Sequence, residues 1–137
     1  FAIKKQGMRK YLLLLGVAAL AISCQTDLKE RAAKECQEYT QKRCPTPIVN
    51  NTSMDSMVFD KATTTLHYYY KFSGLADNAE IINKQKPQLR KMLSNALRAE
   101  TSMKAYKDAG FNFQYTYRST ANPQQILLDE KFTSKDL

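Results

Sequence analysis

Two kinds of periodicity along the chain predict its order of secondary structure. Residues 63–72 and 111–117 place an apolar or aromatic side chain at every second position, which is typical of a strand with one buried face. Residues 89–97 instead repeat apolar positions three and four apart, as in a helix with one buried side. A short strand is predicted at residues 56–60 and a final strand at residues 124–132.

A charged helix is predicted at residues 28–43, before the first strand. Asp27 and Glu30 have the spacing of a capping box, and oppositely charged side chains follow four residues apart. The apolar stripe of this helix is thin, so we expect the helix to rest lightly on the fold and to end before Pro45 and Pro47. The resulting order, α-β-β-α-β-β, predicts the α+β class, with a four-stranded antiparallel sheet and helices packed on one face.

The second helix is expected to bury one face along most of its length. Pro87 fits its first turn, because proline lacks an amide hydrogen and is costly further into a helix. Met103 and Tyr106 extend the pattern past a kink in residues 99–102, and Gly110 is a suitable stop. The residues expected on the buried face are Leu89, Met92, Leu93, Ala96 and Leu97.

An export signal precedes the folded part. Met8 is followed by two basic residues and then by an apolar run over residues 11–22. A membrane-spanning helix needs about 20 apolar residues, so this shorter run indicates a signal peptide at residues 8–23. Residues 1–7 contain no initiator methionine, and we interpret them as upstream read-through or the product of a fragmentary gene call.

The residues Ala21-Ile22-Ser23-Cys24 resemble the lipobox of bacterial lipoproteins. The resemblance implies cleavage before Cys24, a diacylglyceryl group on its thiol and, usually, a further acyl chain such as palmitate on the new amino terminus, which together hold a protein stably on a membrane. Gln25, which follows the cysteine, favours the outer membrane, facing the periplasm. Residues 24–44 would then hold the lipidated cysteine and first helix, and residues 45–137 a small α+β domain. This mature part loosely resembles small uncharacterised envelope lipoproteins of Bacteroidota, which bring no known activity with them.

The net charge of +8 overstates the basicity of the mature chain. Four bases and no acids precede Cys24, so the remainder carries 17 bases against 13 acids, a net charge of +4. Export also makes nucleic acid an unexpected partner. The bases of the second helix have two interpretations, a solvated face or a face for anionic lipid or an acidic envelope protein. The candidate residues are Lys84, Lys86, Arg90, Lys91 and Arg98.

Cys36 and Cys44 are the two thiols that remain beside Cys24. An oxidising compartment favours a disulfide between them. However, eight residues of unbroken helix would separate their Cα atoms by about 12 Å, and a bridge needs less than about 7 Å. Both outcomes stay open at this point.

No motif for catalysis, a metal or a cofactor is evident in the sequence. His67 is the only histidine and is expected on the surface of a strand, without a second ligand at metal-binding spacing. Asp129 and Glu130 are adjacent on a predicted strand, so they should point to opposite faces and cannot form a carboxylate pair around one substrate.

The aromatic rows of the long strands admit two interpretations. They are favoured as the core beneath the second helix, which must bury its apolar stripe, and the alternative is a stacking platform for sugars or bases. The rows are Tyr68, Tyr70, Phe72, Phe111, Phe113, Tyr115 and Tyr117.

Taken together, these features favour a lipid-anchored cell-envelope protein that acts as a non-enzymatic binding or assembly module with an envelope partner. Two alternatives stay open. One is a small envelope hydrolase or carbohydrate-processing enzyme, and the other is a sugar or lipid binder that uses an aromatic cleft. The sequence does not specify an oligomeric state.

Overall fold

The computed structural model describes residues 26–137. The predicted signal peptide at residues 8–23 and the predicted lipidation site Cys24 lie outside this part. A helix over residues 26–43 comes first. The elements that follow are β1 (Thr52–Asp60), β2 (Thr65–Phe72), η1 (Gly74–Ala76), α2 (Ala79–Ala99), η2 (Thr101–Met103), α3 (Lys104–Asp108), β3 (Asn112–Ser119), β4 (Ile126–Phe132) and η3 (Ser134–Asp136).

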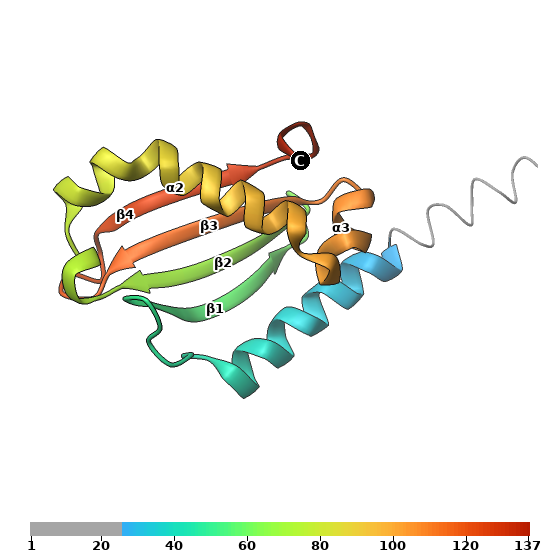
Figure 1. Ribbon diagram of the computed structural model, residues 1–137. Coiled ribbons are helices and arrows are strands. Elements are labelled where there is room, and N and C mark those ends of the chain that lie inside the picture. The colour runs from blue at the N-terminus through green and yellow to red at the C-terminus, as the bar shows by residue number, and fades with distance from the viewer. Residues whose placement is uncertain (1–25) are drawn as a thin grey trace, which may run out of the picture.

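The strands form one four-stranded sheet in the order β1-β2-β3-β4, and the helices pack on one of its faces (Figure 1). The predicted α+β class, element order and one-sided packing are therefore confirmed. The sheet is mixed, however, and not wholly antiparallel as predicted, because β2 and β3 pair in parallel. The chain between β2 and β3 passes over the sheet through helix α2. Such a crossover connection brings the second strand back in the same direction as the first.

Helix α2 begins eight residues before Pro87, which lies in its interior and not in its first turn as predicted. Asn78 caps the helix, since its side-chain oxygen accepts hydrogen bonds from the amides of Glu80 (3.0 Å) and Ile81 (3.2 Å). Ile82 then packs into the core with 3% of its surface exposed. The Asn78 cap and the buried Ile82 hold the first turns of α2 in place, so the helix tolerates Pro87 in its interior.

The aromatic rows form the core face of the sheet, as favoured from the sequence. Phe113 is fully buried, Tyr68, Phe72, Tyr115 and Tyr117 are at least nine-tenths buried, and these residues face the helices. The first helix contributes more than predicted. Ala32 and Cys36 on its inner side are 0% and 2% exposed, because small side chains let the helix approach the sheet closely. The helix is an integral part of the core and does not rest lightly on it.

The apolar stripe of α2 is only partly buried, which differs from the prediction. Leu97 is 2% exposed, whereas Leu89 and Leu93 are half-buried and Ala96 is exposed. Met92, which the pattern predicts on the buried face, is 58% exposed. The helix therefore leaves part of the aromatic sheet uncovered between itself and the helix over residues 26–43.

The outer edge of β1 is occupied by two threonines. The Thr40 hydroxyl accepts a hydrogen bond from the Met57 amide (2.9 Å) and donates one to the Met57 carbonyl (3.0 Å). Thr46 bonds the amide of Met54 through its hydroxyl (2.8 Å) and the carbonyl of Met54 through its own amide (3.0 Å). These contacts leave little of this edge available for a further strand.

The candidate disulfide is not formed, and Cys36 and Cys44 are free thiols. The first helix continues without a break to residue 43, and the Cys44 amide still bonds the carbonyl of Thr40 (3.2 Å). A straight helix keeps the two thiols too far apart to meet. Burial of Cys36 raises its pKa to about 11.

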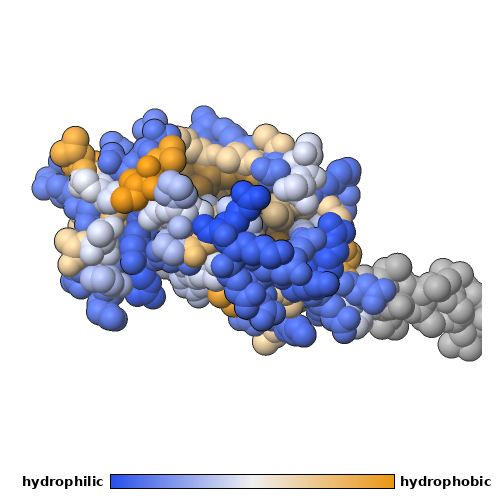
Figure 2. All heavy atoms as spheres, turned by 90° about the horizontal axis from the view of Figure 1, so that it is seen from below, coloured by the Kyte–Doolittle hydropathy of each residue, from blue (hydrophilic) through white to orange (hydrophobic). Residues whose placement is uncertain are grey.

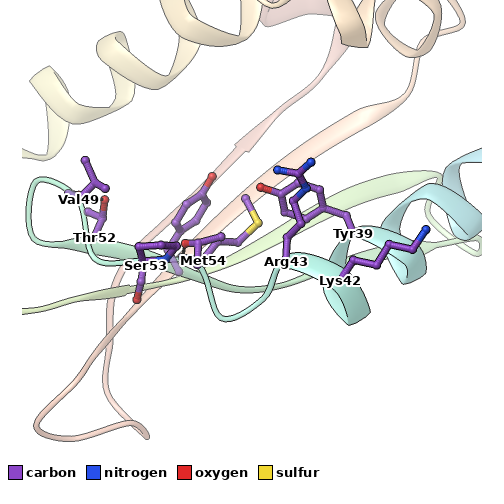
Figure 3. Close-up of a pocket in the computed structure, with 10 residues that line it drawn as sticks. Tyr39, Lys42, Arg43, Val49, Thr52, Ser53 and Met54 are labelled. Carbon is purple, nitrogen blue, oxygen red and sulfur yellow. Dashed lines mark hydrogen bonds between the residues drawn. The ribbon is translucent and has the colours of Figure 1, made fainter.

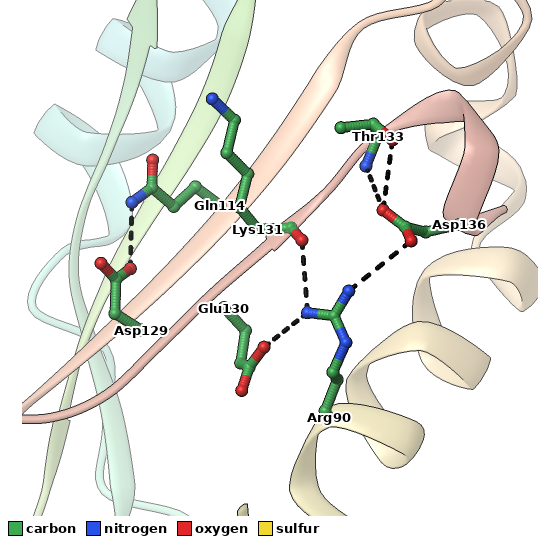
Figure 4. A network of polar contacts seen from close by, with 7 residues as sticks. All are labelled: Arg90, Gln114, Asp129, Glu130, Lys131, Thr133 and Asp136. Atoms are coloured by element: carbon green, nitrogen blue, oxygen red, sulfur yellow. Dashed lines mark hydrogen bonds and ion pairs between the residues drawn. The ribbon is translucent and has the colours of Figure 1, made fainter. Parts of the chain in front are cut away.

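Arg90 of α2 ties the helix to β4 and to the end of the chain (Figure 4). Its guanidinium donates to Glu130 (2.5 Å), lies 3.6 Å from Asp136, and stacks 4.5 Å from the centre of the Phe132 ring. Glu130 points to the helix face and Asp129 to the opposite face, as the alternation predicted.

Candidate functional site

The helix over residues 26–43 and α2 border a groove on the inner face of the sheet. Two adjoining hollows, of about 820 and 500 Å³, share three lining residues, Tyr39, Met54 and Tyr70, and so form one continuous groove. From below, Figure 2 shows apolar side chains in a hollow between hydrophilic ones. The groove crosses β1 and β2 and reaches the end of α2.

Tyrosines form much of the floor of the groove, and two of them stack on neighbouring rings. Tyr68 stacks on Tyr115 with ring centres 4.9 Å apart, and Tyr70 stacks on Tyr117 at 4.7 Å. A sugar ring stacks on a free aromatic face, so the stacked faces of Tyr68 and Tyr70 are not available for sugar stacking. Burial raises the pKa of Tyr70 to about 12, with the neighbouring Tyr39 acting in the same direction.

The hydroxyls of Tyr70 and Tyr115 have no hydrogen-bond partner among residues 26–137. In the same part of the chain, no fully buried side-chain nitrogen or oxygen lacks a partner. Both hydroxyls must therefore reach the solvent, and the groove is where they can do so. The floor thus combines apolar surface with polar atoms that are free to bond a ligand.

One end of the groove is basic and carries exposed apolar residues. Lys42 and Arg43 extend in different directions from the last turn of the first helix (Figure 3). Neither forms an ion pair with any residue in the described part of the chain. Val49, on the loop opposite, lines the same end and is 62% exposed, and its neighbour Ile48 is 66% exposed.

The other end of the groove is acidic. Glu100 follows the last residue of α2 and lines this end beside Ser102 and Met103. Its carboxylate accepts hydrogen bonds from the hydroxyl (2.8 Å) and the amide (3.2 Å) of Ser102, and these bonds lower the pKa of Glu100. Glu100 is therefore ionised at neutral pH, and its carboxylate lies at the opposite end of the groove from Lys42 and Arg43. The ammonium of Lys107 bonds the Glu100 carbonyl (2.8 Å) and also lowers the pKa of Glu100, but Lys107 does not line the groove.

A family model described as a domain of unknown function, DUF8479, matches residues 27–128. The chain belongs to the DUF8479 family. The match covers the first helix and the sheet as far as the third residue of β4, so every residue that lines the groove lies inside the DUF8479 domain. A comparison with curated proteins finds no match.

Three solved structures share the fold of this DUF8479 domain at low sequence identity. A Pseudomonas aeruginosa protein classed as secreted matches with a TM-score of 0.68 and 14% identity, over 81% of this chain and 93% of its own. The type II secretion system pilotin AspS of Vibrio cholerae matches with a TM-score of 0.60 and 13% identity, over 85% and 98%. The type 2 secretion system pilotin EpsS of Vibrio vulnificus matches with a TM-score of 0.61 and 12% identity, over 81% and 92%. At these identities the likeness shows the fold alone.

Three of the candidate basic residues of α2 contact partners within the protein. Lys84 pairs with Glu80 (3.1 Å), Arg90 forms the contacts described above, and Arg98 donates to the carbonyl of Asp136 (2.7 Å). The exposed Lys86 and Lys91 have no ion pair within residues 26–137. The groove does not include these five residues, and their contact with an anionic partner stays a prediction.

His67 lies on the opposite face of the sheet from the groove, in a polar network. Its Nε2 lies 2.7 Å from the Thr116 hydroxyl, which donates its hydrogen to Asp129 (2.9 Å), so His67 must donate to Thr116. The Tyr69 ring stacks on the imidazole at 4.0 Å. A nucleophilic triad places the imidazole between the hydroxyl and the carboxylate, whereas here the hydroxyl stands between the other two groups.

Burial lowers the pKa of His67, although the charges of Asp129 and Asp60 oppose this and those of Arg118 and Lys131 reinforce it. In the described part of the chain, no three His, Cys, Asp or Glu side chains gather where they could hold a metal ion. No helix in the same part is both long and apolar enough to cross a membrane.

The functional residues that sequence reasoning missed are those of the groove walls. Lys42 and Arg43 end a helix, where bases are common because they complement the helix dipole, so nothing in their pattern marks them as a site. Tyr39 falls on the thin apolar stripe of that helix, a pattern that indicates packing and not a site. The exposed apolar pair Ile48 and Val49, directly after Pro47, is the signal that could have drawn attention to this end.

Proposed function

We propose that this chain is an envelope lipoprotein, tethered through lipid on Cys24, that holds a segment of another envelope protein in the groove without catalysing a reaction. The observation that carries the proposal is the groove itself, an open channel with a partly apolar floor, unbonded tyrosine hydroxyls and unpaired charges at its mouth. The shared fold supports an envelope role, because two of the proteins that carry it are secretion-system pilotins and the third is classed as secreted. Gln25 supports a position in the outer membrane, facing the periplasm.

The groove is tested by photo-crosslinking in intact cells with the full-length protein. A photoreactive residue replaces Met54 in the groove or, as the matched control, Met92, which is exposed on α2 but lies outside it. Position 54 is expected to give a discrete protein adduct and position 92 only background. Equal labelling from both positions, or none from position 54, would contradict the proposal.

The anchor is tested separately by mass spectrometry of the native protein. A diacylglyceryl group on Cys24 is expected, and Cys24→Ala should release the protein from the membrane fraction or leave the precursor uncleaved. An unmodified Cys24 in membrane-fractionated mature protein would refute the lipid anchor while leaving the groove proposal standing.

A further inference from the structure

The opposite charges at the two ends of the groove give it a direction. Lys42 and Arg43 line one end and the ionised Glu100 lines the other, with Tyr70 and Met54 between them. A ligand that spans the groove meets two basic side chains at one end and one carboxylate at the other. Complementary charges across an interface fix its orientation and exclude reversed binding.

Lys42 and Arg43 share the absence of an ion pair within residues 26–137 with Lys86 and Lys91, but only Lys42 and Arg43 line the groove. Arg31 pairs with Glu35 (2.7 Å) and Lys104 with Asp108 (2.6 Å), each within its own helix. Lys42 and Arg43 have no such acid within residues 26–137, although they stand beside exposed apolar side chains. Carboxylates of a ligand are the groups that would form ion pairs with these two bases, and an arginine can bind a carboxylate through two parallel hydrogen bonds.

The chemistry of the groove floor favours a polypeptide over a lipid chain. Tyr70 and Tyr115 offer hydroxyls that have no partner in the described part of the chain, and an acyl chain supplies neither donor nor acceptor. A peptide supplies both in its backbone at every residue except proline. Met54, Met57 and Met103 also line the groove, and flexible thioether side chains adapt to varied apolar side chains.

We propose that the groove binds an amphipathic segment of the partner protein in one fixed direction. Carboxylate side chains of the segment lie against Lys42 and Arg43, its apolar side chains lie over Tyr70, and its basic or uncharged end lies near Glu100. This inference rests on the proposed function, because it names the chemistry of the segment that the groove holds.

The direction of the segment is tested by mapping adducts from the two ends of the groove in intact cells. Photoreactive residues at Val49 and at Ser102 report on the basic and the acidic end. Sequencing of the crosslinked peptides should find aspartate or glutamate next to the Val49 adduct and none next to the Ser102 adduct. The reverse order, or no carboxylate at either end, overturns this inference and leaves the groove proposal intact.

Charge reversal provides the second test, read as the yield of the adduct from position 54. Lys42→Glu with Arg43→Glu should lower the yield about tenfold or more, while Lys86→Glu with Lys91→Glu on the outer side of α2 should not. Exchanging the partner's carboxylates for lysine should restore crosslinking to the first variant. An unchanged yield, or loss without restoration, overturns the inference, and thermal unfolding of each purified full-length variant checks that it folds.

The mass of the adduct separates the other occupants. An adduct with the mass of a phospholipid, or of a second copy of this chain, would overturn the inference. Absence of any groove adduct would overturn the proposed function itself.

Discussion

Replacing Ile82 with alanine tests whether α2 is anchored ahead of its proline. Ile82 is 3% exposed, so the substitution removes three buried carbons, worth about 2.4 kcal/mol at roughly 0.8 kcal/mol each. The cavity that remains adds to this, which gives a total of about 3–4 kcal/mol. For a domain of about 110 residues, with roughly 2.1 cal/mol/K of unfolding entropy per residue, the melting temperature should fall by about 13–17 °C.

The neighbouring Ile81 is the matched control, because it sits on the same turn of α2 and is 42% exposed. Ile81→Ala should cost less than about 1 kcal/mol, since alanine favours the helix and little burial is lost. Both variants are made in the soluble fragment from Gln25 onward and unfolded by heat and by urea, with circular dichroism as the readout. Equal and small losses would refute the reasoning, because they would mean that the chain before Pro87 is not held against the core.

Three further outcomes are expected of the same fragment. Thr40→Val should cost about 1–3 kcal/mol in urea unfolding, because Met57 loses both partners, and a monomer by size exclusion would show that the bared edge does not attract strands. In native thiol labelling Cys44 should react well before Cys36, whose burial raises its pKa to about 11, and resistance of both thiols to alkylation in denaturant would instead indicate a disulfide. The folded pKa of His67 lies below its unfolded value near 6.5, so its folded state resists protonation. Stability should therefore be full above pH 6.5 and decline as the pH falls through that value, and an equal decline in His67→Gln would refute this origin.

The sequence by itself determined the elements that depend on neighbouring residues. Alternation in residues 65–72 and 112–119 specified two strands and the face that each buries, because successive side chains of a strand point to opposite sides. Gly110, with φ at +78°, ends α3 where only glycine adopts that backbone easily, and its place after the helical pattern was visible in the sequence. The same alternation predicted that Asp129 and Glu130 point to opposite faces of the sheet. The predicted export signal and lipobox likewise rest only on local order, and they lie outside the described residues.

Only the tertiary structure decided how distant elements meet. Apolar and polar side chains alternate in the same way in parallel and antiparallel strands. The parallel pairing of β3 with β2 therefore follows only from the path of the chain through α2. The start of α2 depended on the burial of Ile82, which no local pattern distinguishes from its exposed neighbour. The groove has the same origin, because it is the space between two helices that lie apart in sequence and do not close over the sheet. Lys42 and Glu100 belong to one site for that reason alone, since the paths of the two helices over the sheet place them at its opposite ends.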